Sequence, residues 1–140
     1  MNTLEDMSKS EVLHQQAMEY YDNAYYGEIK GKLSPELVLE NYRKAFELEK
    51  QAALELLTLK ADSLTRAVIF RSAASIASRI GEWRECEKLA CMGLCAEPPK
   101  YVEKQLRELL KDAILELEKI EETRLAKLKS EEETSENTMF

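Results

Sequence analysis

Residues 67–98 read AVIFRSAASIASRIGEWRECEKLACMGLCAEP, and this stretch decides the fold. Between residues 65 and 80 the apolar side chains recur at the spacing of an α-helix and cover one broad face. Gly81 predicts a left-handed end to this helix, because glycine adopts a positive φ at little cost. A second helix follows from Trp83 to about Cys95, and Pro98-Pro99 must stop it. The stretch therefore predicts a two-helix hairpin.

Two further helices are predicted on the N-terminal side of this hairpin. Ser8 and Glu11 match a capping box, which predicts a helix from there to about Tyr26, followed by a loop over residues 27–34. Ser34 is a suitable N-cap with Pro35 at the first helical position, and this next helix should end near residue 57. Its apolar stripe has one interruption, at Glu49.

A fifth helix is predicted from about Lys100 to Leu128. Its apolar residues alternate steps of four and three over about two heptads: Leu106, Leu110, Ala113, Leu117 and Ile120. Such a stripe docks on the preceding hairpin or pairs with another chain, and the short heptad run favours docking. Residues 129–140 are rich in glutamate and are predicted to be a disordered acidic tail.

The charge of the chain limits the class of partner. Among 140 residues there are 20 basic and 27 acidic side chains, so the formal net charge is −7. Residues 129–140 contribute −3, from one lysine and four glutamates, and the remainder contributes −4. An acidic chain repels phosphate backbones, so we expect no nucleic acid among its ligands.

The N-terminal sequence and the cysteines predict a cytoplasmic protein. The first twelve residues, MNTLEDMSKSEV, are polar and acidic, unlike a signal peptide, and no apolar run has the length of a membrane span. We therefore expect no membrane contact. The three cysteines, Cys86, Cys91 and Cys95, are odd in number and clustered, which suits a compartment where thiols stay reduced.

The central stretch also resembles one tetratricopeptide repeat (TPR), a helical hairpin with small and large residues at fixed places. Gly81-Glu82-Trp83 matches the turn of the repeat, Phe70 falls at the large aromatic place of the first helix, and Pro98 closes the repeat. A weaker match joins the first helix to residues 38–46. The resemblance implies an all-α, TPR-like domain over residues 1–128, with about five helices in two hairpins plus a C-terminal capping helix.

Ala77 and Ala90 depart from the repeat pattern, which usually places bulky side chains there. Large tyrosine side chains of the first helix could fill that space: Tyr20, Tyr21, Tyr25 and Tyr26. The chain also resembles small bacterial, notably cyanobacterial, TPR-like proteins that share the FRSAAS and GE core. That second resemblance implies no activity.

The TPR resemblance implies where a partner would bind. In that family the inner helix of a repeat supplies the ligand contacts, so Arg71, Ser75, Ser78 and Arg79 are expected to face a concave groove. Guanidinium groups can hold a carboxylate through two hydrogen bonds, which points to an acidic or C-terminal carboxylate group on the partner. The alternative is that these arginines pair with glutamates of their own chain.

Other candidate sites are less specific. Cys91 and Cys95 share a helix face, yet no second ligand pair or nearby histidine completes a zinc site, so we expect small buried side chains and no metal. His14 could pair with a cysteine or serine, but no catalytic motif accompanies it, and we expect a surface or capping residue. The tyrosines could stack nucleobases, but the acidic residues around them favour core packing.

These features predict a non-enzymatic adaptor that binds a protein or peptide through a TPR-like groove, without cofactors, as a monomer or weak homodimer. One alternative is a regulatory or structural subunit, such as an antitoxin-like or assembly factor, whose apolar surface is covered in a stable complex. A small helical enzyme is the other alternative.

Overall fold

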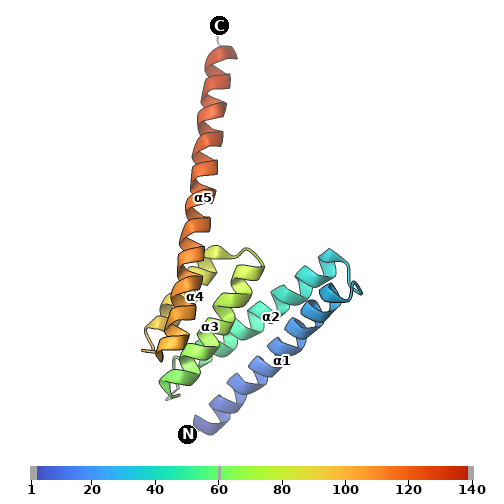
Figure 1. The fold of residues 1–140 in the computed structure, drawn as a ribbon, viewed down its shortest axis with the longest axis vertical. Helices are drawn as coiled ribbons and strands as arrows, with labels where there is room; N and C mark the ends of the chain where they lie inside the picture. Colours follow the sequence, from blue (N-terminus) through green and yellow to red (C-terminus); the bar gives the residue numbers. More distant parts are fainter. Residues whose placement is uncertain (1–2, 60, 139–140) are drawn as a thin grey trace.

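The computed structural model describes residues 3–59 and 61–138. Over these residues the chain forms five α-helices and no β-strand (Figure 1). The prediction of an all-α fold with about five helices is therefore confirmed.

The first helix, α1 (Thr3–Ile29), starts earlier and ends later than the sequence predicts. The predicted capping box is wrong, because residues 8–11 lie inside the helix. Ser10 is buried, and its hydroxyl donates to the carbonyl oxygen of Ala52 in the next helix, 3.0 Å away. At the other end the helix continues through Gly27, where a Cβ would lie 2.5 Å from the side chain of Leu33. A side chain at this position would therefore force the half-buried side chain of Leu33 to shift.

Local capping chemistry sets the starts of α2 (Pro35–Glu55) and α3 (Ser63–Arg79). The Ser34 hydroxyl accepts a hydrogen bond from the amide of Leu37, as predicted, at 3.2 Å. Asp62 performs the same role for α3, because its carboxylate accepts from the amide of Thr65 at 2.8 Å. Both caps satisfy a backbone donor that the first helical turn leaves unpaired.

The turn between α3 and α4 (Trp83–Leu94) has the predicted geometry. Gly81 has a φ of +75°. The amide of Glu82 donates to the carbonyl of Ala77 at 2.9 Å, which closes the end of α3.

The last helix, α5 (Lys100–Thr138), is much longer than predicted and projects well beyond the other helices (Figure 1). The sequence placed its end at Leu128 and a disordered tail over residues 129–140. The structure instead continues the helix through Thr138, and residues 139–140 lie outside the described part. No glycine or proline interrupts residues 100–138, and glutamate, lysine and leucine are good helix formers.

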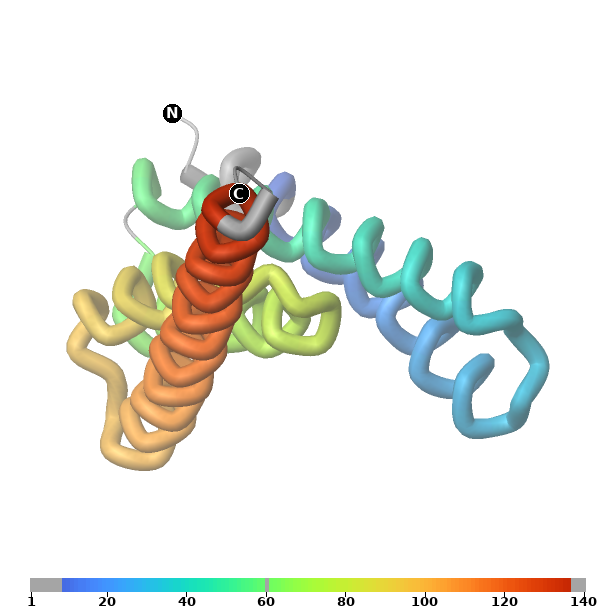
Figure 2. The backbone as a smooth tube through the Cα atoms, turned by 90° about the horizontal axis from the view of Figure 1, so that it is seen from above, coloured from blue at the N-terminus to red at the C-terminus, as the bar shows by residue number. Residues whose placement is uncertain are grey.

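Neighbouring helices in the sequence are also neighbours in space. α1 and α2 lie side by side along most of their length, α3 packs on α2 and α4, and α5 packs on both α3 and α4. Seen along α5, the α1–α2 pair reaches away from the α4–α5 side of the molecule (Figure 2). The molecule therefore has two arms, with α3 between them.

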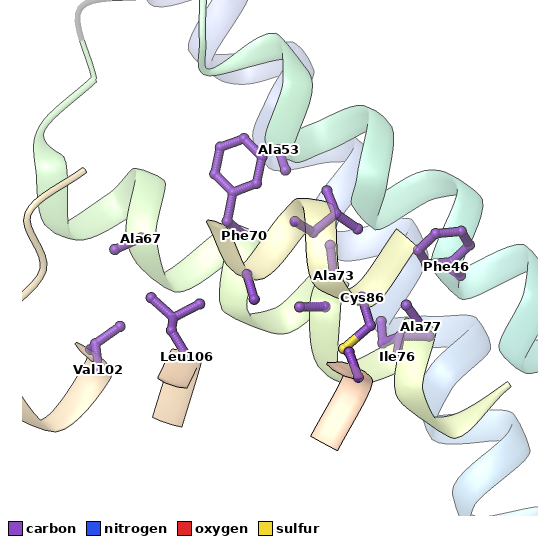
Figure 3. Close-up of a cluster of buried hydrophobic side chains, with 14 of the residues drawn as sticks. Phe46, Ala53, Ala67, Phe70, Ala73, Ile76, Ala77, Cys86, Val102 and Leu106 are labelled. Carbon is purple, nitrogen blue, oxygen red and sulfur yellow. The ribbon is translucent and has the colours of Figure 1, made fainter. Parts of the chain in front are cut away.

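The core lies where α3 meets α2, α4 and α5 (Figure 3). Phe70 is 1% exposed, as its place in the repeat pattern predicted, and Trp83 packs half-buried at the edge of the same cluster. Ala77 and Ala90 are fully buried. Of the four tyrosines expected to fill space beside these alanines, Tyr20 and Tyr21 pack against this cluster, whereas Tyr25 and Tyr26 are exposed.

Candidate functional site

A groove of about 550 Å³ lies on the face formed by α1, α3 and α5. α2 and α4 contribute no residue to its walls. Its lining combines apolar, hydroxyl and charged side chains. They are Met18, Tyr21, Arg71, Ser72, Ser75, Ile76, Gln105, Glu108, Leu109 and Asp112.

Two of the four residues predicted to contact a partner, Arg71 and Ser75, lie in this groove. Arg71 is half-buried, and its guanidinium Nη1 donates to Oε1 of Gln105 on α5 at 2.5 Å. Within the described part of the chain, Arg71 forms no ion pair. Its positive charge is therefore held at the groove by a neutral side chain.

The other two, Ser78 and Arg79, lie further along α3 and do not line the groove. The Ser78 hydroxyl donates back to the carbonyl of Ser75 at 2.6 Å. The Arg79 guanidinium lies 5.4, 5.9 and 5.6 Å from the ring centres of Tyr21, Tyr25 and Tyr42. Arg79 thus makes cation–π contacts with tyrosines of its own chain, and among the described residues it forms no ion pair with a glutamate.

The acidic side of the groove was missed from the sequence. Glu108 and Asp112 are exposed on α5, in the same groove as Arg71. The signal was present, because the α5 residues of the groove follow the i, i+3, i+4, i+7 spacing of one helical face from Gln105 to Asp112.

A buried polar network lies next to the groove and joins three helices. Glu49 of α2, the interruption in the apolar stripe, is fully buried. The Nδ1 atom of His14 on α1 lies 2.8 and 2.9 Å from its two carboxylate oxygens. The hydroxyl of Ser72 on α3 donates to Oε2 at 2.5 Å. His14 is therefore a half-buried partner of Glu49, which corrects the expectation of a surface or capping residue.

This network has the residue types of a serine hydrolase but a different order of contacts. Catalysis needs the serine hydroxyl to donate to a ring nitrogen of the histidine, which then acts as the base. Here Ser72 and His14 both bind the carboxylate, so the serine proton points to Glu49. The hydrogen bond from His14 to Glu49 raises the pKa of the imidazole above its ordinary value of 6.5, against the lowering effect of burial. A protonated His14 neutralises the buried carboxylate.

The cysteines differ from one another in burial. Cys86 is fully buried, and burial raises the pKa of its thiol to about 11. Cys91 and Cys95 are exposed, so the expectation of buried cysteines is correct only for Cys86. Among the residues that the structure describes, no group of three histidine, cysteine, aspartate or glutamate side chains is placed to hold a metal ion.

The structure defines an all-helical protein with a mixed-charge groove on one face. No protein-family model, no curated protein and no solved structure matches the chain. None of the helices in residues 3–59 and 61–138 has both the length and the apolar character to cross a bilayer.

Proposed function

We propose that this protein is a non-enzymatic, cytoplasmic adaptor that binds a segment of another protein in the groove between α1, α3 and α5. The groove itself carries the proposal. Its volume of about 550 Å³ lies in the range of specific ligand sites, and it offers both an apolar floor and fixed charges.

The charges of the groove describe the segment that would fit. Arg71 would take a carboxylate of the partner, in accordance with the acidic ligand expected from the sequence. Glu108 and Asp112 would take a lysine or arginine. Met18 and Leu109 would receive an apolar side chain between these charged ends. The ligand of the proposal is therefore an amphipathic peptide or helix with charges of both signs, rather than a uniformly acidic one.

The order of helices around the groove supports the TPR-like assignment, which we also propose. The groove is lined by every second helix, α1, α3 and α5, and the helices between them lie outside it. The TPR resemblance of residues 67–98 implied this alternation of inner and outer helices. One observation favours the alternative role as a subunit of a stable complex, namely the exposed apolar residues on α5, such as Ile120 and Leu125.

The groove proposal is tested with Arg71→Ala and a matched control, Arg84→Ala. Arg84 is an exposed arginine of α4, outside the groove, and pairs with Glu87 at 2.6 Å. An affinity pull-down from the native host supplies the partner, and calorimetric titration measures its dissociation constant with each variant. We expect Arg71→Ala to weaken binding by about 10- to 100-fold, because it leaves a partner carboxylate unpaired, and Arg84→Ala to have little effect. Arg79 is left unchanged, because replacing it would remove its contacts with the tyrosines and could lower the stability of the fold.

Equal affinities of the two variants for the recovered partner, with both folds intact by circular dichroism, would contradict the proposal. Neutralising the acidic wall with Glu108→Gln and Asp112→Asn gives an independent test. It should weaken binding of the same partner and leave the melting temperature close to that of the wild type, since both residues are exposed.

A further inference from the structure

The distal part of α5 presents an apolar face that no other helix covers. Ala113 is fully buried and Leu117 is half-buried, and the C-terminal part of α5 stands clear of the other helices (Figure 1). Ile120, Leu125 and Leu128 on this part are 54%, 53% and 44% exposed. At 3.6 residues per turn these three residues and Leu117 fall on one side of the helix. Glu121 and Arg124 lie between them and pair with each other at 2.6 Å.

The sequence of this segment is self-complementary about its own midpoint. The midpoint lies between Glu122 and Thr123 in the segment 116–129, ELEKIEETRLAKLK. Five of the seven pairs at equal steps from it join two apolar residues or two opposite charges, and the other two are Glu122 with Thr123 and Lys119 with Ala126. The apolar matches are Leu117 with Leu128 and Ile120 with Leu125, and the charge matches are Glu116 with Lys129, Glu118 with Lys127, and Glu121 with Arg124.

We propose that the distal α5 segment binds a second copy of this chain, with the two helices antiparallel and a twofold axis at the midpoint of residues 116–129. Such an axis brings each residue level with its match in the other copy. Leu117 then lies level with Leu128 and Ile120 with Leu125, and the charged residues Glu121 and Arg124 lie level with each other in the middle of the face. A twofold interface uses the same patch on both copies, which is what a self-complementary segment provides. The proposal is independent of the groove and of any ligand that the groove binds.

The charges on the two flanks of the apolar face select the antiparallel direction. Glu116 and Lys127 are eleven residues apart, about three turns, and therefore share one flank. Glu118 and Lys129 share the other flank for the same reason. In an antiparallel pair like flanks face each other, so Glu116 lies near Lys127 of the other copy and Glu118 near Lys129. In a parallel pair unlike flanks meet at the same level, which sets Glu116 against Glu118 and Lys127 against Lys129.

The overlap ends at residue 116, because Leu106, Leu110 and Ala113 continue the same face of α5 and are packed in the core. The matched segment spans two heptads only, so we expect a weak dimer that dissociates at about 10–100 µM.

Exchanging the charges tests the proposal. One variant carries Glu116→Lys with Glu118→Lys, and the other carries Lys127→Glu with Lys129→Glu. Each variant alone sets like charges against each other at all four contacts, whereas a mixture of the two restores every contact. Sedimentation equilibrium of the full chain, in reducing buffer and over about 10–500 µM, measures association. We expect wild-type dimers, at least about a tenfold weaker association of each variant alone, and recovery of wild-type affinity in the equimolar mixture.

A control with the same change in charge is Glu47→Lys with Glu122→Lys, since Glu47 lies on α2 and Glu122 lies on the outer side of α5. It should dimerise like the wild type. Three results overturn the proposal: a wild type that stays monomeric over the whole range, single variants that associate as well as the wild type, or a mixture that does not recover. Equal weakening by the control also overturns it, because the effect would then follow net charge alone.

Discussion

The carboxylate of Glu49 is buried where α1, α2 and α3 meet. Its contacts with His14 and Ser72 determine how much this burial lowers the stability of the fold. An unpaired buried carboxylate is strongly destabilising, whereas one that is paired and hydrogen-bonded is tolerated. His14 supplies the opposite charge when its imidazole is protonated, and Ser72 supplies a second hydrogen bond. Ser72 also lines the groove, so this network fixes the wall of the groove as well as the packing of three helices.

The pH dependence of stability should report on this network. Glu49 raises the pKa of His14, so the folded protein holds the imidazole proton more tightly than the unfolded chain does. This contribution to stability is complete below the ordinary histidine pKa of about 6.5 and is lost as the pH rises through the folded-state value. We expect the free energy of unfolding, from urea titrations, to fall in the wild type as the pH rises above about 6.5 and to change less with pH in His14→Gln.

Ser72→Ala is the control for this prediction. This substitution removes a hydrogen bond to Glu49 but leaves the histidine. It should therefore lower the free energy of unfolding by about 1–2 kcal/mol throughout the pH range and keep its pH dependence. A wild type and a His14→Gln variant with the same pH dependence would show that folding leaves the proton affinity of His14 unchanged, which contradicts the effect of Glu49 on its pKa.

The sequence identified Glu49 as an anomaly but not the reason for it. A polar residue inside an apolar stripe is visible from spacing alone. Its partners lie 35 and 23 residues away, and only the packing of α1 and α3 on α2 brings them to it. Arg79 is exposed, as its place on α3 indicates, but its contacts with tyrosines of two other helices depend on the packing of α1 and α2 beside α3.

Among the helices, the contact of α4 with α5 depends on one residue without a side chain. Gly93 is buried in α4, and a Cβ there would lie 2.8 Å from Cδ2 of Leu106 and 3.2 Å from Cβ of Phe70. Leu106 and Phe70 are themselves fully buried, so neither has free space to move into. The glycine therefore sets how closely α5 approaches the hairpin.

Gly93→Ala separates packing from helix propensity. In an exposed helix this change stabilises by about 1 kcal/mol, because alanine is the better helix former. In this buried position we expect a net loss of about 1–2 kcal/mol in a urea titration, since overpacking outweighs the gain. Gly81→Ala is destabilising for a different reason, its positive φ, and so makes a useful comparison. A stabilised Gly93→Ala variant would mean that α4 and α5 are further apart than described.

Helix limits were predictable where the signal is local. Ser34 and Gly81 act within a few residues of themselves, and both predictions are confirmed. Ser10 shows the opposite case, because its hydroxyl bonds to α2 instead of capping its own helix. The extent of α5 was not predicted, because a run of glutamates is typical of a disordered tail. Glutamate nevertheless has a high helix propensity, and the helix continues through this run.

At the scale of the whole molecule, the sequence predicted one wall of the groove and missed the other two. Arg71 and Ser75 were assigned from the polar face of α3 and the resemblance to an inner repeat helix. The walls on α1 and α5 depend on the angles at which these helices cross α3, which spacing along a sequence does not specify. If α5 also pairs two chains as proposed, the dimer carries two grooves, and a partner with two binding segments gains affinity from both.

The central claim is that this protein acts by binding a partner segment between α1, α3 and α5, and amide chemical-shift mapping tests it most directly. Adding the partner recovered from the native host to isotope-labelled protein should shift the amides of groove residues, among them Tyr21, Arg71, Ser75 and Asp112. The chemical shifts of amides on the outer surfaces of α2 and α4, such as those of Arg43 and Arg84, should not change. Large shifts confined to α2 and α4, with the groove residues unchanged, would contradict the account.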